Sequence, residues 1–358
     1  MSHPHGTRSA AEFPRAAAPT PNPPLAHRIG CGYNRASSER SALRRIILLL
    51  LLSWASAQNH PAPTQTPNAK QQVLWEKLEA TIGEIDRSLD GVLGIAIKDL
   101  TTDQTFFLRA DEVFPQASTI KIAVLAELYH QSQVAAQNHS EEGKLTDGYT
   151  VQTSDLVPDS DIMQGLTPGV TRLTNRDLAT MMVAVSDNSA TNVLIDRLGM
   201  DKINALMDSL GLAHTRLRRK MMDLQAAREG RENVSTPREM MSLLESLYRG
   251  KVLNKALTED FLQILSTHKD SFIPRDLPAD VRSANKPGEL EGVRNDCGIV
   301  FAPNRPYVIC VMSTYLTNER AGEEVISKIS LVAYRMFSRL GRASDYGRVV
   351  SLADSSTP

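Results

Sequence analysis

The spacing of apolar side chains predicts strands near both ends of the chain and helices in between. Apolar residues recur at helical intervals from Gln71 to Leu89, and the continuous apolar run Gly91–Ile97 is typical of a buried strand. A turn then leads to a second expected strand, Thr105–Leu108. From Ser118 to about Leu265 the pattern is helical. The clearest helices of this middle segment are Ile120–Tyr129, Asn175–Val185, Ala190–Leu198, Lys202–Leu210 and Pro237–Leu247.

Strand patterns return near the end of the chain, at Val281–Ala284, Cys297–Phe301 and Tyr307–Met312. A last amphipathic helix runs from about Glu319 to Phe337, and Asn318 is placed to cap it. This order predicts an α/β (α+β) fold in which both termini build one sheet, flanked by helices. The helical segment is then an inserted second domain, and a cleft between the two is the natural place for chemistry.

The same patterns divide the chain into four parts. We expect a leader (1–57), a flexible linker rich in Pro, Thr, Asn and Gln (58–70), a folded domain (71–340) and a disordered tail (341–358). Within the domain, the expected sheet segments are 71–115 and 270–340, and the expected helical segment is 118–268.

The leader has the features of a secretory signal peptide. Arg44 and Arg45 precede the short apolar run Ile46–Leu52, and Ala55-Ser56-Ala57 supplies the small residues that a signal peptidase needs. The alternatives are a short buried helix or an anchor, but no apolar run reaches the roughly 18 residues of a membrane span. We therefore expect cleavage near Ala57 and a periplasmic or secreted protein. The arginine pair also suggests a twin-arginine export route.

The charge balance changes when the leader is set aside. The whole chain has 40 basic and 41 acidic residues, but the part after Ala57 has 33 and 39, a formal net charge of −6. A nucleic-acid-binding protein usually shows a basic excess. Neither total does, so no nucleic-acid partner is expected.

Export would leave two cysteines, Cys297 and Cys310, on either side of an expected hairpin turn. An oxidising compartment permits a disulfide. If residues 300 or 301 pair with residues 307 or 308, the two side chains should point to opposite faces of the sheet. We therefore expect two free, buried thiols.

Several familiar catalytic patterns are absent from the sequence, including two histidines at i and i+4, C-x-x-C, G-x-S-x-G, G-x-G-x-x-G and the P-loop. The pattern S-x-x-K occurs at Ser118/Lys121, Ser266/Lys269 and Ser283/Lys286. Only the first opens an apolar helix, where burial should lower the pKa of the lysine toward that of a base able to activate the serine. The alternative is a capping serine followed by a surface lysine.

Two further motifs follow the first in a meaningful order. Ser186-Asp187-Asn188 lies between helical segments, and Lys286-Pro287-Gly288 lies on a late strand. S-x-x-K, then S-D-N, then K-x-G is the signature of penicillin-recognising serine enzymes. With these motifs in this order, the chain resembles class A β-lactamases from about Gln71 to Leu340. That family has an antiparallel sheet and an inserted helical domain.

The resemblance implies a role for each matching residue. Ser118 would attack the lactam carbonyl, Lys121 would act as base, and Ser186 would pass a proton to the leaving nitrogen. Asn188 would bind the side-chain amide of the substrate, and Lys286 would attract its carboxylate. The remaining implied roles are an oxyanion hole from the backbone N–H groups of Ser118 and Glu289 beside Gly288, a carboxylate contact from Arg294, and a structural role for Asp187.

The sequence departs from the family at two positions. Met221 stands where the family has the glutamate that serves as base for deacylation, and a thioether cannot accept a proton. Asp223 or Glu232 would have to replace that base on a rewired loop. Pro287 replaces a Thr or Ser whose hydroxyl binds the substrate carboxylate, so Arg294 would have to compensate. A proline there also requires an edge strand.

Three functional hypotheses follow. The first is a class A-type β-lactamase that hydrolyses the lactam amide through an acyl-serine. The second is a hydrolase of the same fold acting on a D-Ala-D-Ala peptide or an ester, and the third is a β-lactam-binding sensor that deacylates slowly. Each needs a small β-lactam or peptidoglycan-like partner, and none needs a metal or cofactor. We expect a monomer.

Overall fold

The computed structural model describes residues 69–140 and 142–350. The expected leader with its cleavage site near Ala57, nearly all of the expected linker and the last eight residues lie outside the described residues. In the described part, no helix is long and apolar enough to cross a membrane.

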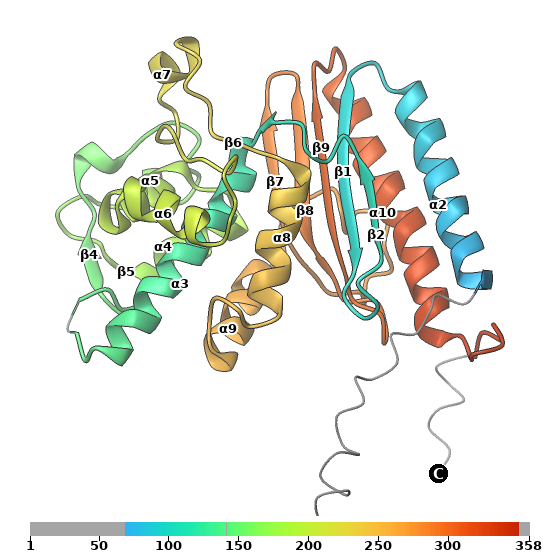
Figure 1. Cartoon of the computed structure of the whole chain (residues 1–358). Helices are drawn as coiled ribbons and strands as arrows, with labels where there is room; N and C mark the ends of the chain where they lie inside the picture. The colour runs from blue at the N-terminus through green and yellow to red at the C-terminus, as the bar shows by residue number, and fades with distance from the viewer. Residues whose placement is uncertain (1–68, 141, 351–358) are drawn as a thin grey trace, which may run out of the picture. The chain divides into compact units, whose positions relative to one another are not determined.

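A five-stranded antiparallel sheet lies at the centre of the described domain (Figure 1). Its strand order is β2-β1-β9-β8-β7, so strands from the two ends of the chain meet where β1 pairs with β9. The strands are β1 (Val92–Asp99), β2 (Thr105–Leu108), β7 (Ser283–Leu290), β8 (Val293–Val300) and β9 (Tyr307–Thr314). This arrangement confirms the expected fold class, with a sheet built from both termini.

Side chains alternate between the two faces of the sheet and enter two separate hydrophobic cores. Along β9, Val308, Cys310 and Met312 join one core, while Tyr307, Ile309 and Val311 join the other. The first core is shared with α8 (Pro237–Tyr248) and the helical segment, and the second with α2 (Ala69–Ser88) and α10 (Glu319–Arg342). Figure 1 shows α2 and α10 together on one side of the sheet. As expected, the Asn318 side chain caps α10 by accepting from the backbone N–H of Ala321.

The inserted segment is mostly helical. Besides α8, it contains η1 (Ala117–Ile120), α3 (Lys121–Gln137), η2 (Thr153–Asp155), η3 (Met163–Gly165), α4 (Asn175–Ala184), α5 (Asn188–Leu198), α6 (Met200–Ser209), α7 (Leu224–Arg228) and α9 (Lys255–Leu265). The expectation of an all-helical insert is wrong in detail, because β4 (Gly148–Thr150) pairs with β5 (Arg172–Thr174), and β6 (Val234–Ser235) pairs with β3 (Phe114–Pro115), which precedes the insert. Strands of two or three residues are too short to show an alternating pattern.

Two segments near the C-terminus differ from their expected limits. The strand expected at Val281–Ala284 begins at Ser283 and continues to Leu290, so Lys286-Pro287-Gly288 lies within a strand. That strand, β7, is at the edge of the sheet, where Pro287 is tolerated because an edge strand has one side without a neighbouring strand. In the segment expected as a disordered tail, α10 continues to Arg342 and Ala343 forms a bridge with Val349.

The two cysteines are free and buried, as expected, but the expected reason is wrong. Val300 pairs with Tyr307, and that register places Cys297 directly opposite Cys310. Directly opposite residues of an antiparallel pair share a face of the sheet. Both thiols therefore lie in the same core, where burial and the neighbouring Cys310 raise the pKa of Cys297 above its ordinary value.

Candidate active site

Ser118 lies in the short helical turn η1, which leads directly into α3. Lys121 is one turn further on and is completely buried. Strand β7 passes very close to this turn, since a Cβ on Gly288 would lie 2.7 Å from the Gln116 carbonyl oxygen and 3.0 Å from the Ser118 nitrogen. Only glycine fits this approach, which brings the β7 backbone beside the backbone N–H of Ser118.

Ser186 connects the other three predicted catalytic side chains. Lys121 Nζ donates to Ser186 Oγ at 3.0 Å and to the Ser186 carbonyl oxygen at 2.5 Å. Ser186 Oγ in turn donates to Ser118 Oγ at 3.0 Å, and Lys286 Nζ lies 3.1 Å from Ser186 Oγ. Lys121 also donates to Asn188 Oδ1 at 2.9 Å. The structure thus places Ser118, Lys121, Ser186 and Lys286 in one hydrogen-bonded group.

The backbone around Ser186 is held in an uncommon conformation by Asp187. Ser186 has a φ of 57°, in the left-handed region that a non-glycine residue rarely adopts. One carboxylate oxygen of Asp187 caps α5 by accepting from Ala190 N–H at 2.9 Å. The other accepts from the N–H groups of Ile162 and Met163. Asp187 therefore ties the loop that presents Ser186 to a second loop across the site.

The two lysines of the group have lowered pKa values. Burial lowers the pKa of Lys121 well below its ordinary value and the charge of Lys286 lowers it further, while Asp187 opposes the shift. Burial, followed by the charge of Lys269, lowers the pKa of Lys286 to about 7. A lysine with such a pKa can be neutral near neutral pH and can then accept a proton.

Two cavities meet at Ser118. The larger one, about 560 Å³, is lined by Ser118, Ser186, Asn188, Lys286, Pro287 and Glu289, together with Lys269. The smaller one, about 140 Å³, is lined by Ser118, Asn188, Arg219, Met221 and Glu289 among others. In the sequence, Lys269 belongs only to an S-x-x-K match that does not open an apolar helix, and no local pattern indicates its place beside this site.

Met221 lies against the smaller cavity. Asn192 holds its backbone from both sides, accepting from Met221 N–H at 2.8 Å and donating to the Met221 carbonyl oxygen at 3.1 Å. The side chain is 7% exposed. Met221, which stands where the family has its deacylating glutamate, thus lines the same cavity as Ser118 and offers a thioether in place of a carboxylate.

The two residues considered as replacement bases have other partners. Asp223 caps α7 by accepting from Ala226 N–H at 2.9 Å, and Glu232 forms an ion pair with Arg219 at 2.9 Å. Asn233, the residue after Glu232, supports the same loop by accepting from the backbone N–H groups of Arg218 and Arg219. Neither Asp223 nor Glu232 lines either of the two cavities at Ser118. Both carboxylates instead fasten the loop that carries Met221.

The Arg294 guanidinium has its partners outside the catalytic group. Its Nε lies 3.1 Å from a carboxylate oxygen of Glu323 on α10, and its Nη1 donates to the carbonyl oxygens of Leu290 and Val293. The distance from Arg294 Nε to Glu289 Oε2 is 3.8 Å. Arg294 is not among the residues that line the 560 Å³ cavity. The compensation expected from it for the missing hydroxyl at Pro287 therefore has no support in this geometry.

Known proteins resemble this chain over most of its length. The model of the β-lactamase enzyme family matches residues 74–337. β-Lactamase ROB-1 of Haemophilus influenzae is 30% identical over 278 residues, covering 74% of this chain and 85% of its own. A β-lactamase structure from Sphaerobacter thermophilus has a TM-score of 0.65 and 30% identity over 73% of this chain and 97% of that one. A PBP-A variant, solved as an acyl-enzyme complex with penicillin G, has a TM-score of 0.65 and 26% identity over 73% of this chain and 96% of its own.

Proposed function

The chain belongs to the class A β-lactamase family, and we propose that it is a serine hydrolase that opens the amide of a β-lactam through an acyl-serine at Ser118. The observation that carries this proposal is the hydrogen-bond chain from Lys121 through Ser186 to Ser118, at the wall of an open cavity. A serine becomes a useful nucleophile only when a neighbouring base can take its proton.

In the proposed acylation, neutral Lys121 is the base and Ser186 connects it to Ser118. The Ser118 hydroxyl passes its proton to Ser186 Oγ, whose own proton moves to Lys121 Nζ. Ser118 Oγ then bonds to the lactam carbonyl carbon, and the negative charge on the carbonyl oxygen is stabilised by the backbone N–H groups of Ser118 and Glu289. When the C–N bond breaks, Ser186 delivers a proton to the nitrogen and recovers one from Lys121.

The side chains proposed to contact the substrate line the same cavity as Ser118. Asn188 lies where an amide of the acyl side chain can pair with it, and Lys286 supplies positive charge on the β7 side. Gly288 permits the close approach of β7 to Ser118, and Glu289, the next residue of the strand, lines the same cavity. The lowered pKa of Lys121 supports its role as the base, because a cationic lysine cannot accept a proton.

Met221 favours a second candidate function. Hydrolysis of the acyl-enzyme needs a base that activates water, and loss of a general base typically slows a step about 10²–10⁴-fold. An acyl-enzyme that persists would suit a penicillin-binding protein or sensor, or a hydrolase whose usual substrate is a D-Ala-D-Ala peptide or an ester. The PBP-A structure with penicillin G attached shows an acyl-enzyme in a related fold.

We also propose that the protein is exported, with cleavage near Ala57, and acts as a monomer in the periplasm or outside the cell. N-terminal sequencing of the exported protein should begin near Gln58, and a start far from it would contradict the proposed site. Light scattering of the cleaved protein should give the mass of one chain.

Chromogenic cephalosporin (nitrocefin) turnover combined with intact-mass detection tests the main proposal. Wild type should form a covalent adduct and release hydrolysed product, and Ser118→Ala should do neither. Ser266→Ala is the matched control, since Ser266 opens another S-x-x-K pattern but bonds Arg282 and the Leu262 carbonyl. An adduct without turnover would favour the second candidate, and wild type that forms no adduct would overturn both.

A further inference from the structure

The proposed function needs a group that binds the substrate carboxylate, and two expected contributors are missing. Pro287 has no hydroxyl, and the Arg294 guanidinium is held by Glu323 on α10. Lys286 remains, but its Nζ already contacts Ser186 Oγ and the Pro287 carbonyl oxygen. One further cation in the cavity would complete the site.

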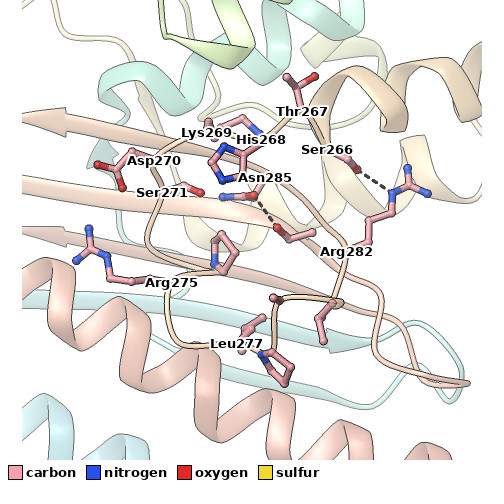
Figure 2. A pocket seen from close by; sticks show the side chains of 15 residues that line it. Ser266, Thr267, His268, Lys269, Asp270, Ser271, Arg275, Leu277, Arg282 and Asn285 are labelled. Carbon is pink, nitrogen blue, oxygen red and sulfur yellow. Dashed lines mark hydrogen bonds between the residues drawn. The ribbon is translucent and has the colours of Figure 1, made fainter.

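Lys269 is placed to be that cation. It follows α9 and lines the 560 Å³ cavity together with Ser118, Ser186 and Lys286. It also lines a neighbouring cavity of about 710 Å³, and Figure 2 shows it there beside His268, Asp270 and Asn285. Lys269 therefore lies where the cavity that Ser118 lines adjoins the 710 Å³ cavity.

The bonding of Lys269 leaves its ammonium group able to take an anion. Its Nζ donates to the Leu265 carbonyl oxygen at 2.9 Å, and within the described residues it forms no salt bridge. An ammonium has three donors, so two remain. The charge of Asp296 on β8 raises the pKa of Lys269, but the Asp296 oxygens accept from Asn285 and from the N–H groups of Phe272 and Ile273.

The charges around Lys269 also favour an anion. Burial lowers the pKa of Lys269 to about 8, and its charge helps to lower that of Lys286. Two neighbouring ammonium groups in a partly buried cavity repel each other, and a carboxylate between them would replace this repulsion with two attractive contacts. Four carboxylates also line the cavity, but all of them belong to exposed residues: Asp159, Asp161, Asp270 and Glu289.

We propose that Lys269, acting with Lys286, binds the carboxylate of the substrate and so replaces the hydroxyl absent at Pro287 and the diverted Arg294. The inference rests on the proposed acylation of Ser118 by a β-lactam. It makes Lys269 a specificity residue, because it selects substrates that carry an anion on the side of the leaving nitrogen.

The test compares penicillin G with its methyl ester, which lacks the negative charge, by following the rate of adduct formation at Ser118 by intact mass. Wild type should acylate faster with the acid. Lys269→Met should slow acylation by the acid roughly 10–100-fold, the usual effect of removing a hydrogen bond to a charged group. It should leave the rate with the ester nearly unchanged, and Lys269→Arg should restore much of the preference for the acid.

Lys255→Met is the matched control, because it removes the same charge from an exposed position on α9. It should keep the wild-type preference. Equal losses with acid and ester in Lys269→Met would indicate a structural role for Lys269 and overturn the inference, as would unchanged rates with both. Wild type that is acylated by neither compound would refute the proposed function itself, and the inference with it.

Discussion

Asn192 holds the backbone of Met221 with two hydrogen bonds, and the Met221 side chain packs in the first hydrophobic core. Both bonds from Asn192 reach the main chain and do not depend on the side chain, so Met221→Glu should keep them and add a carboxylate to the cavity that Ser118 lines. We expect this variant to shorten the lifetime of the acyl-enzyme about 10²–10⁴-fold, the usual contribution of a general base. The decay of the adduct mass measures it. Met221→Gln is the control of similar size, and equal lifetimes in the two variants would contradict the expectation.

The lowered pKa of Lys286 predicts how acylation depends on pH. The cation is the form that attracts a carboxylate, and with a pKa of about 7 it is lost as the pH rises through 7. Lys121 must be neutral to act as the base, and it becomes neutral as the pH rises. Once the pH is high enough for that, acylation by penicillin G should slow as the pH rises above 7. Rates of adduct formation between pH 5.5 and 9 measure this.

Lys286→Arg supplies the control for the pH profile, because a guanidinium stays charged throughout that range. In Lys286→Arg, the fall in the acylation rate at alkaline pH should move to a higher pH than in wild type. A decline at the same pH in wild type and Lys286→Arg would assign the titration to another group.

At the residue scale, the sequence predicted the group around Ser118 because each member belongs to a short motif whose order carries information. It did not reveal Lys269 or the direction of Arg294. Those depend on contacts between distant segments, since Arg294 is held by Glu323 from another element. No local pattern encodes such a pairing.

At the element scale, the contact between β7 and η1 sets the geometry of the site. Gly288→Ala would place a methyl group within 3.0 Å of backbone atoms of Gln116, Ser118 and Thr119, so the strand would have to move away. Loss of one oxyanion donor typically costs about 10²–10³ in rate, and we expect acylation to slow by that order. Adduct kinetics measure the loss.

Circular dichroism should show that Gly288→Ala remains folded. Gly165→Ala is the control, because a Cβ there would meet no atom within 4 Å, and it should acylate at the wild-type rate. Wild-type kinetics in Gly288→Ala would mean that the backbone contact does not position the reacting groups.

The elements themselves were predictable where a pattern is long enough to repeat. The helices from Asn175 and Pro237 begin where the sequence indicated, and Asn318 caps α10. The short pair β4–β5 was not foreseen. The sequence also did not reveal that Cys297 and Cys310 lie directly opposite each other on one face of the sheet, because strand register depends on the precise pairing across a turn.

At the scale of the whole molecule, the two hydrophobic cores lie on opposite faces of the sheet. We therefore expect a substitution in the core formed with α2 and α10 to change the stability of the protein without changing acylation. Trp75 is 1% exposed in the core formed with α10, where its ring meets Phe337 edge-on at 5.6 Å. Trp75→Ala should lower the free energy of unfolding by about 3–5 kcal/mol, as large-to-small core substitutions do. Urea denaturation measures it, and acylation kinetics of the folded protein should not change.

Val73→Ala, at a side chain that is 45% exposed on the same helix, should leave the urea midpoint nearly unchanged. If Trp75→Ala slowed acylation as well, the core around α2 and α10 would also be supporting the active site through the sheet. Two independent cores would then be the wrong description.

The position of β9 in the sheet has a consequence for protein synthesis. This strand lies between β1 and β8, yet it is the last of the five to leave the ribosome. Ser118, Lys121, Ser186 and Lys286 all precede it, so a message cut short before Tyr307 would still encode every proposed catalytic side chain. Its product would lack the strand that joins the two halves of the sheet, and we expect a premature stop codon there to yield a chain cleared by proteases.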